Sequence, residues 1–505
     1  MTDASARLDP HRVIAEIDRR LFGGFVEHLG RHIYDGIYEP THPAADEAGF
    51  RTDVIELVRE LGVSTIRYPG GNFVSGYRWE DGIGPVAERP RRLDLAWHST
   101  ETNEIGLHEF ADWLERVGSD LMLAVNLGTR GTQEALDLLE YANTSVRTSS
   151  SDRRAANGRR EPFGVSMWCL GNEMDGPWQL GHRNAEDYGK LASRTAKAMR
   201  LLDPSIELVA CGSSGRDMPT FGTWERTVLE HTIEDVDFIS CHAYYQERHG
   251  KTQEFLASAV DMAKFIESVV VTADAVAAEK KIDKQINISF DEWNVWYLFN
   301  DDDSMNEKSE EDWPVAPRLL EDQYSVLDAV VFGDLLITLL QHANRVRSAS
   351  LAQLVNVIAP IMTEPGGPAW RQTTFFPFSI TSRLALGRSV RVPVQASTFE
   401  SERFGAVSSV NAVATIDADG VSLFVVNRST SEASTLTVDL SPLVAELGHV
   451  VTVLESYLLH DDDLAAANTL AATERVGVGP VECDVDSHSL TVTLPAVSWA
   501  AVSLA

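Results

Sequence analysis

Two glutamates each follow a short apolar run, and their placement suggests acid–base chemistry. Glu173 follows Val165–Leu170 and Glu292 follows Ile286–Phe290. Both runs are short and rich in apolar and β-branched residues, as strands are. Two carboxyl groups can share the hydrolysis of a glycosidic bond, because one protonates the leaving group while the other attacks the sugar or activates water.

Polar residues stand at the ends of other predicted strands too. The carboxyl ends of parallel strands meet at one edge of a sheet, so these groups should lie near the two glutamates. Burying polar groups is costly unless they are paired, and several at one site indicate a ligand rich in hydroxyl groups, such as a sugar. The candidate binding residues are Glu27, Arg67, Asn72, Asn172, His242, Tyr244 and Gln353. His242 alone would more often be a core histidine with its hydrogen bonds satisfied, but its place beside Tyr244 at a strand edge favours ligand contact.

Tryptophans close to these motifs could form walls that stack on sugar faces. Trp97, Trp293 and Trp296 are the candidates, although large aromatic side chains are equally common in a core.

The elements that must position these residues alternate between strand-like and helix-like segments. Such βα units predict a parallel sheet with right-handed crossovers, and eight of them predict a (β/α)8 TIM barrel over 20–380. A doubly wound open sheet is the alternative, disfavoured because no Gly-rich phosphate loop opens a helix after the first strand. The predicted strands are Phe22–His28, Ser64–Pro69, Leu121–Leu127, Val165–Leu170, Leu208–Gly212, Phe238–Ala243, Ile286–Phe290 and Ser350–Ile358.

This count places Glu173 at the fourth strand and Glu292 at the seventh, which face each other across a barrel mouth. A gap of about 5 Å between the carboxyl groups would predict a retaining mechanism, and about 6.5–9.5 Å an inverting one.

The pattern of residue types changes toward the C-terminus. Short Val/Thr-rich runs separated by turn residues replace the helical pattern, for example Val410–Ile416 and Val421–Val426. We therefore predict an antiparallel β-sandwich over 381–505, possibly with a strand from 1–19.

Composition excludes several classes of partner. The 505 residues include 43 basic and 75 acidic ones, a formal charge of −32, which argues against nucleic acid or an anionic membrane. The N-terminus lacks the apolar core of a signal peptide, and no 18-residue apolar span occurs, so we expect a cytoplasmic protein.

The sequence predicts no cofactor and no metal. Its four cysteines form no CxxC pair, and His108-Glu109 does not begin an HExxH motif. The acidic segment Asn300–Asp312 is expected to be either a solvated loop or a rim loop over the pocket.

Several motifs together resemble the family 51 glycoside hydrolases, and more specifically the intracellular α-L-arabinofuranosidases. The resemblance covers essentially the whole chain. One departure is Tyr68, where much of the family has Trp. The matching segments are Phe22–Gly30, Arg67–Tyr77, Trp79–Pro85, Gly171–Glu173, Phe290–Asn294 and Leu351–Ile361.

The resemblance implies a retaining mechanism and a pocket for a terminal arabinofuranosyl unit. Glu173 would be the acid/base and Glu292 the nucleophile. It also implies a homo-oligomer, often a hexamer. Residues that would bind the furanose or orient the carboxylates are Glu27, Arg67, Asn72, Asn172, Tyr244 and Gln353, with His242 and Trp296 in second rank.

The hypothesis is therefore an exo-acting α-L-arabinofuranosidase that acts on arabino-oligosaccharides from arabinan or arabinoxylan. A β-xylosidase or endoglucanase on the same scaffold remains an alternative. A catalytically silent carbohydrate-binding protein is a third possibility, disfavoured because both glutamates are present.

Overall fold

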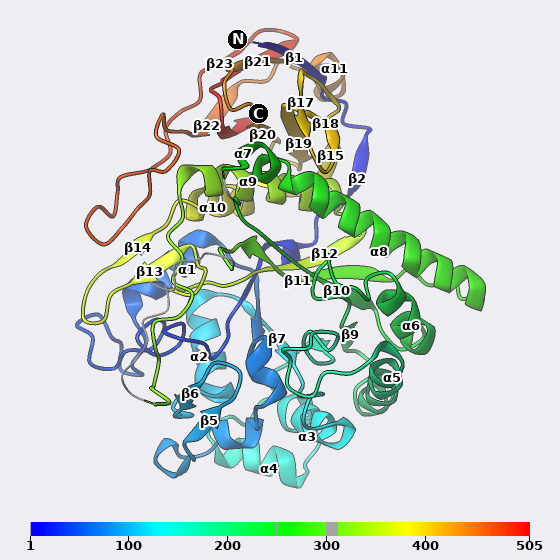
Figure 1. Ribbon diagram of the computed structural model, residues 1–505, viewed down its shortest axis with the longest axis vertical. Coiled ribbons are helices and arrows are strands. Elements are labelled where there is room, and N and C mark those ends of the chain that lie inside the picture. Colours follow the sequence, from blue (N-terminus) through cyan, green and yellow to red (C-terminus); the bar gives the residue numbers. More distant parts are fainter. Residues whose placement is uncertain (1, 249, 299–311) are drawn as a thin grey trace.

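A computed structural model describes residues 2–248, 250–298 and 312–505. Eight parallel strands close into a barrel in the order β10-β11-β12-β3-β4-β7-β8-β9, which confirms the predicted TIM barrel and excludes an open sheet (Figure 1). The strands are β3 (Gly23–Phe25), β4 (Thr65–Tyr68), β7 (Asp120–Ala124), β8 (Met167–Cys169), β9 (Glu207–Ala210), β10 (Phe238–Tyr245), β11 (Asn287–Val295) and β12 (Val346–Leu351).

Helices surround the barrel, and most of them bury one apolar face. In α2, Leu107, Phe110, Leu114 and Val117 recur at helical spacing and are all buried, and Gly118 ends the helix in the left-handed conformation. The helices of eight or more residues in the barrel region are α1 (Thr52–Leu61), α2 (Leu107–Val117), α3 (Thr132–Asn143), α4 (Ser149–Ala156), α5 (Ala185–Leu202), α6 (Thr223–Thr232), α8 (Ser258–Lys280), α9 (Val326–Gln341) and α10 (Phe375–Leu384).

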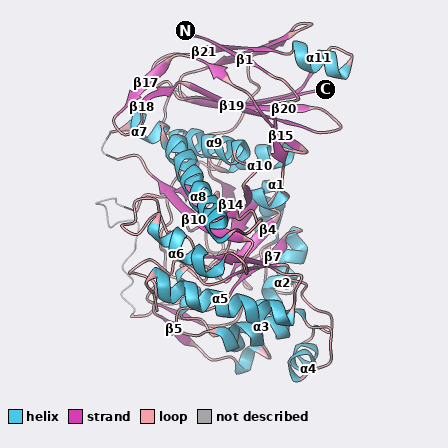
Figure 2. Cartoon of the chain, turned by 90° about the vertical axis from the view of Figure 1, so that its right-hand side faces the viewer, coloured by secondary structure: helices cyan, strands magenta, loops and turns pink. Residues whose placement is uncertain are grey.

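Two sheets form the β-sandwich that lies beyond α9 and α10 in Figure 2. Side chains alternate along β24 (Ser489–Leu494), where Leu490, Val492 and Leu494 face the core and the residues between them are half-buried, whereas every residue of the strand Val421–Asn427 is buried. One sheet is β16 (Val394–Gln395), β1 (Thr2–Arg7), β21 (Ser434–Asp439), β24 (Ser489–Leu494) and β23 (Cys483–Val485). The other is β2 (Val13–Glu16), β15 (Arg388–Arg391), β19 (Val410–Ile416), β20 (Val421–Asn427), β25 (Ser498–Leu504) and β22 (Val453–Leu459).

The N-terminal strands belong to these sheets. β1 pairs antiparallel with β16 and parallel with β21, and β2 pairs antiparallel with β15. The parallel β1–β21 pair is the exception in an otherwise antiparallel sandwich.

Helix α9 joins the barrel to the sandwich, and nearly all of it is buried. Gly333 allows the close approach, since a Cβ there would lie 2.4 Å from Cδ1 of Trp499. Asp334 on the same helix accepts hydrogen bonds from Arg428 (2.6 Å) and Asn411 (2.8 Å) of the sandwich. In the described part of the chain, no helix is long and apolar enough to cross a membrane.

Candidate active site

The two glutamates converge at the carboxyl end of the barrel. Glu173 lies four residues beyond β8, in the left-handed conformation at φ 43°. One oxygen of each carboxyl group and a ring nitrogen of His242 all lie within 4.8 Å of one another. His242 Nδ1 is 2.9 Å from Glu173 Oε1 and 3.6 Å from Glu292 Oε2. This is the one cluster with metal-ligand spacing in the described ranges, and two carboxyl groups at this separation can also act on one bond.

The sequence predicted that Glu292 would follow its strand. In the structure it lies inside β11. Ser289 and Glu292 pair with Ser240 and His242, so three steps along β11 face two along β10. This β-bulge inserts an extra residue and redirects the side chains that follow it. The strand therefore continues past the glutamate instead of ending before it.

Arg67 and Tyr244 hold the carboxylate of Glu292. Arg67 Nη1 donates to Oε1 at 3.0 Å, and the Tyr244 hydroxyl donates to Oε2 at 2.7 Å. Burial raises the pKa of Glu292; His242 and Arg67 oppose this shift, whereas Glu173 adds to it. Burial opposes the charged form of His242, but Glu292 and Glu173 outweigh it and raise the pKa of His242. Each group's charge thus depends on its neighbours.

Arg67 also ties Asn172 to this centre. Its Nη2 donates to Asn172 Oδ1 at 2.6 Å, while the Asn172 amide nitrogen is buried and has no partner among the described residues. Arg67 itself is buried and lies over the ring of Phe25, 4.8 Å from its centroid.

Glu27 and Gln353 form a second polar group beside the first. Glu27 Oε1 accepts from the Phe73 backbone and the Trp97 indole, both at 2.9 Å, and Oε2 accepts from Gln353 Nε2 at 3.1 Å. Burial, with Glu292 adding to it, raises the pKa of Glu27 to about 8 against the lowering effect of the donors from Phe73 and Trp97. The amide of Gln353 is hydrogen-bonded in turn to His32.

The remaining predicted residues border the same space. Gly71 leaves room between the carboxylates, because a Cβ there would lie 3.3 Å from oxygens of both Glu27 and Glu292. Asn72 follows it and is half-buried. Trp296 meets the Tyr244 ring edge-on at 4.9 Å, and its indole nitrogen is buried without a partner in the part of the chain that the structure describes. The structure thus brings all ten predicted residues into one region.

Trp293 is a core residue and not a pocket wall. It is fully buried and packs on Phe332 at 4.7 Å. Trp97 instead donates its indole N–H to Glu27, as described above. Tyr68 stacks on Phe110, and its hydroxyl lies 2.8 Å from His28 Nε2.

Sequence reasoning missed Trp178. Its indole nitrogen donates to Glu173 Oε2 at 2.6 Å, and the residue is 53% exposed. The available signal was its position five residues after Glu173, on the same strand-to-helix connection.

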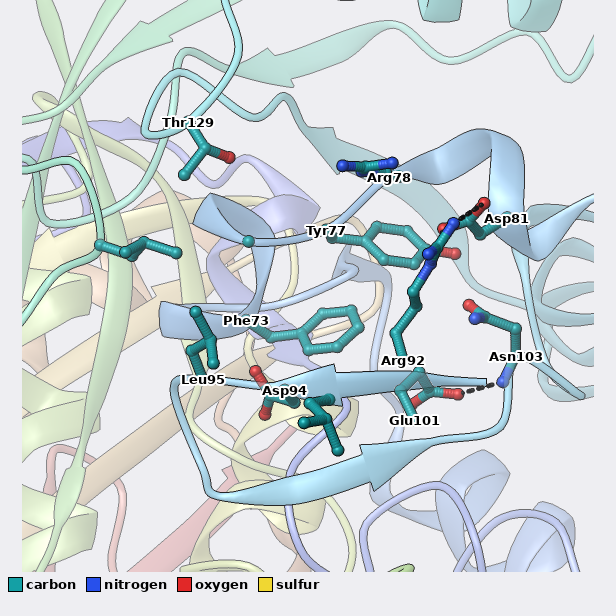
Figure 3. A pocket seen from close by; sticks show the side chains of 13 residues that line it. Phe73, Tyr77, Arg78, Asp81, Arg92, Asp94, Leu95, Glu101, Asn103 and Thr129 are labelled. Carbon is teal, nitrogen blue, oxygen red and sulfur yellow. Dashed lines mark hydrogen bonds and ion pairs between the residues drawn. The ribbon is translucent and has the colours of Figure 1, made fainter. Parts of the chain in front are cut away.

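A hollow of about 290 Å³ adjoins the site on the loops that follow β4, β7 and β8 (Figure 3). Phe73 and Tyr77 contribute its aromatic side chains, and Leu180 lines it from the connection that carries Glu173. Leu93 and Leu95 also line it and are 56% and 65% exposed. Leu93 lies within β5 (Arg92–Asp94), and Leu95 lies in the turn that leads to β6 (Ser99–Glu101). The rest of the lining is largely polar and includes Arg78, Asp81 and Arg92. A hollow of mixed character beside a polar centre can hold part of a ligand that extends out of it.

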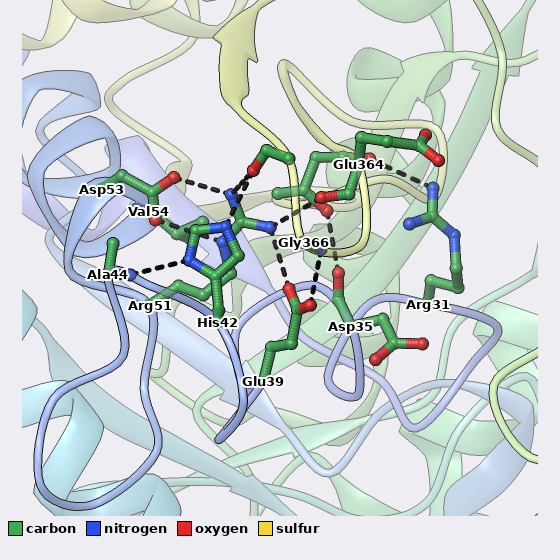
Figure 4. A network of polar contacts seen from close by, with 12 residues as sticks. Arg31, Asp35, Glu39, His42, Ala44, Arg51, Asp53, Val54, Glu364 and Gly366 are labelled. Carbon is green, nitrogen blue, oxygen red and sulfur yellow. Dashed lines mark hydrogen bonds and ion pairs between the residues drawn. The ribbon is translucent and has the colours of Figure 1, made fainter.

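A polar network fixes the loops beyond Gln353 (Figure 4). Arg51 is completely buried and donates to Glu39, Asp53 and the carbonyl oxygens of Glu364 and Gly367. It links the connection after β3 to the connection after β12, and so supports the loop that carries Gln353. Of the acidic segment Asn300–Asp312, only Asp312 lies within the described residues, with Oδ1 3.0 Å from His98 Nε2.

Comparison with known proteins gives a consistent result. The α-L-arabinofuranosidase 1 domain matches residues 57–261, and the α-L-arabinofuranosidase C-terminal domain matches residues 291–498. An exo-α-(1→6)-L-arabinofuranosidase of Bifidobacterium longum is 60% identical over 97% of this chain and 95% of its own length. An intracellular exo-α-(1→5)-L-arabinofuranosidase of Streptomyces lividans is 56% identical over all of this chain and 76% of its own.

Solved structures agree with this. A family 51 α-L-arabinofuranosidase from Bifidobacterium longum superposes with a TM-score of 0.95 at 50% identity, covering all of both chains. The arabinose complex of a Thermotoga maritima α-L-arabinofuranosidase gives a TM-score of 0.84 at 31% identity, over all of this chain and 99% of the other. With this fold, this cluster of carboxyl groups and these relatives, the chain belongs to the family 51 α-L-arabinofuranosidases, which are glycoside hydrolases.

Proposed function

We propose that the protein is a retaining, exo-acting α-L-arabinofuranosidase that removes terminal arabinofuranosyl units from arabino-oligosaccharides. The observation that carries the retaining mechanism is the separation of the carboxyl groups, whose nearest oxygens lie within 4.8 Å. Retaining enzymes hold the two groups about 5–5.5 Å apart, and inverting enzymes need about 6.5–9.5 Å to admit a water molecule.

Glu292 is the nucleophile in this proposal, and Glu173 is the acid/base. A Glu292 oxygen bonds to the anomeric carbon while the glycosidic C–O bond breaks, and the leaving oxygen takes the proton of Glu173. Water then gives its proton to Glu173 and its oxygen to the anomeric carbon, which releases Glu292. The contacts of Glu292 with Arg67 and Tyr244 favour this division, because they hold an ionised carboxylate in place.

The furanose binds among the groups that surround these carboxylates. Its hydroxyls would satisfy the buried nitrogens of Asn172 and Trp296, which have no partner within the described residues. Glu27 accepts hydrogen bonds from the hydroxyls, and Gln353 donates hydrogen bonds to them. Asn72 contributes a further amide group at the rim. His242, Arg67 and Tyr244 orient the carboxylates.

The leaving group lies along the hollow that Leu180, Leu93 and Leu95 line. The acid/base must reach the leaving oxygen, and the connection that carries Glu173 continues directly to Leu180. Replacing Leu93 and Leu95 with serine should raise KM for arabino-oligosaccharides and leave hydrolysis of methyl α-L-arabinofuranoside unchanged. Equal effects on both substrates would mean that the hollow does not hold the leaving group.

The experiment that tests the function combines substrate and stereochemistry. Arabinose release from arabino-oligosaccharides, followed by NMR, should give the α-anomer first. Because the relatives are named for (1→5) and (1→6) linkages, both isomers are needed. Greater activity on an aryl xyloside or on carboxymethyl-cellulose, or release of the β-anomer first, would contradict the proposal.

The roles of the glutamates need separate variants. Glu292→Ala should abolish turnover. Glu173→Ala should retain slow hydrolysis of a substrate with a good leaving group, and azide should accelerate it by forming the α-arabinosyl azide, because azide attacks the β-linked glycosyl-enzyme from the face that water uses. Normal activity of Glu292→Ala would rule out Glu292 as the nucleophile. Absence of an azide product with Glu173→Ala would rule out Glu173 as the acid/base.

We also propose that the protein is cytoplasmic and forms a homo-oligomer. Several relatives are named intracellular arabinofuranosidases. Cell fractionation tests the first statement and multi-angle light scattering the second.

A further inference from the structure

Asp291 immediately precedes the nucleophile in the chain and takes no part in the reaction as described above. It is 2% exposed, and its Oδ2 is 3.7 Å from Arg67 Nε. Successive residues of a regular strand point to opposite faces, yet Asp291 and Glu292 both approach Arg67. The bulge in β11 explains this, because it inserts one extra residue between Ser289 and Glu292.

Arg67 has two carboxylates near it, and only one of them takes part in the reaction. Its Nη1 and Nη2 donate to Glu292 and Asn172, but its Nε is buried without a hydrogen bond to any residue that the structure describes. The nearest charge on that side is Asp291. A buried cation without a counter-charge is strongly destabilising, so the second carboxylate becomes important whenever the first is neutral.

Glu292 becomes neutral once in every turnover of the retaining reaction, on which this inference rests. When its oxygen bonds to the anomeric carbon, the carboxylate becomes an ester, and its negative charge appears on Glu173 as that residue gives up its proton. Arg67 contacts Glu292 directly, whereas Glu173 contacts His242 and Trp178. The charge therefore moves away from Arg67 while the intermediate exists.

We propose that Asp291 is a positioning residue, a permanent counter-ion that holds Arg67 in place while the charge of Glu292 is consumed and restored. Asp291 is anchored for this task. Its Oδ1 accepts a hydrogen bond from Ser289, and the thiol of Cys169 lies 3.7 Å from Oδ2. These partners come from β11 and β8, and Arg67 comes from β4.

The test is the pH dependence of kcat/KM, since its acid limb follows ionisation of the nucleophile in the free enzyme. The titratable and charged groups that face Glu292 are Arg67, His242, Tyr244, Glu173 and Glu27. In Asp291→Asn, a negative charge is lost and Arg67 acts on Glu292 alone, which favours its ionised form. The acid limb should move to lower pH, and kcat/KM should fall about 10–100-fold.

A matched control separates this role from loss of a buried charge. Asp334 is also a buried aspartate beside a buried arginine, Arg428, but it lies between barrel and sandwich. Asp334→Asn should lower Tm and leave the acid limb where it is in the wild-type enzyme. An unmoved acid limb in both variants would overturn the proposal, because Asp291 would then be structural only.

A second variant keeps the test informative if Asp291→Asn does not fold. Ser289→Ala removes the anchor but keeps the charge, so Asp291 can turn toward Arg67 Nε and draw Arg67 away from Glu292. The acid limb should then move to higher pH, opposite to the shift in Asp291→Asn. An acid limb at the wild-type position, or one shifted to lower pH, would contradict the proposal.

Inhibition by L-arabinose distinguishes positioning from collapse of the pocket. Its Ki should stay within about twofold of wild type in both variants if the pocket is intact; a large rise in Ki would show a collapsed pocket and overturn the proposal. If the wild-type protein does not hydrolyse arabinofuranosides at all, the proposed function fails first. If it does, and only the predicted limb shifts are absent, the role of Asp291 fails alone.

Discussion

Two buried clusters of aspartate and arginine, one between barrel and sandwich and one at the active site, differ in how their polar groups are paired. Between barrel and sandwich, Asp334 accepts from Arg428 and Asn411, and Arg428 also donates to Ser408. At the active site, nitrogens of Arg67, Asn172 and Trp296 are buried without partners among the described residues. Unpaired buried groups cost stability wherever they lie, but those of Asn172 and Trp296 lie beside the carboxylates, where substrate can satisfy them, whereas that of Trp499, which also has no partner in the described chain, lies against Gly333 in the interface.

The largest expected effect comes from removing the charge of the nucleophile. Glu292→Gln keeps the shape of the side chain, so kcat should fall by at least about 10³-fold. Because Asp291 still balances Arg67, Tm should change far less than the rate. Circular dichroism and kcat, measured on the same sample, check this. A large loss of Tm would show that Glu292 is chiefly structural.

The interface pair should show the reverse pattern. Asp334→Asn leaves Arg428 buried without its counter-charge, and breaking such a pair costs about 3–5 kcal/mol. Urea unfolding should show this loss, while kcat/KM of the folded protein at 25 °C remains near wild type. Preserved stability with reduced activity would remove the contrast between the two clusters.

A buried carboxyl group outside the active site should cost stability without serving substrate. Glu134 on α3 is buried, with Oε1 3.6 Å from Arg130 Nη1 and Oε2 without a partner within the described ranges, and burial raises its pKa to about 8 against the lowering effect of Arg130. A carboxyl group with a raised folded pKa binds its proton more tightly when folded. The wild-type protein therefore loses stability as pH rises from about 4.5 to about 8.

Glu134→Gln removes that loss. Its Tm should match wild type near pH 4 and exceed it at pH 8.5, with kcat/KM unchanged. A Tm difference independent of pH would mean that packing, and not ionisation, sets the cost.

Part of the contrast between the active site and the interface can be predicted from the sequence, and part cannot. The eight barrel strands and the convergence of Glu27, Arg67, Tyr244 and Gln353 follow from where apolar runs end. The bulge in β11 does not, because register depends on pairing with β10 and β12. Asp291 is part of the Phe290–Asn294 motif, but the sequence alone does not assign it a role.

Helices show the same limit. The spacing of apolar residues in Leu107–Val117 marks α2 clearly, whereas the sequence of α6 (Thr223–Thr232) shows no spacing as clear. Its polar and β-branched residues give a weak helical signal on their own. Packing of Trp224 and Val228 against the barrel, where both are buried, stabilises it. Which indole nitrogens would lack a partner could not be predicted either, because hydrogen bonds depend on tertiary contacts.

Two tryptophans only three residues apart give the smallest but most direct test of the comparison. The indole nitrogens of Trp293 and Trp296 are both buried without a partner in the described structure, but only Trp296 borders the pocket. Trp296→Phe keeps an aromatic ring and loses the donor. If substrate satisfies that donor, KM should rise about tenfold, the equivalent of one hydrogen bond of about 1.4 kcal/mol. Trp293→Phe should lower Tm and leave KM unchanged, since its nitrogen faces the core. Equal KM values for the two variants would mean that an unpaired group beside the carboxylates is no more available to substrate than one in the core.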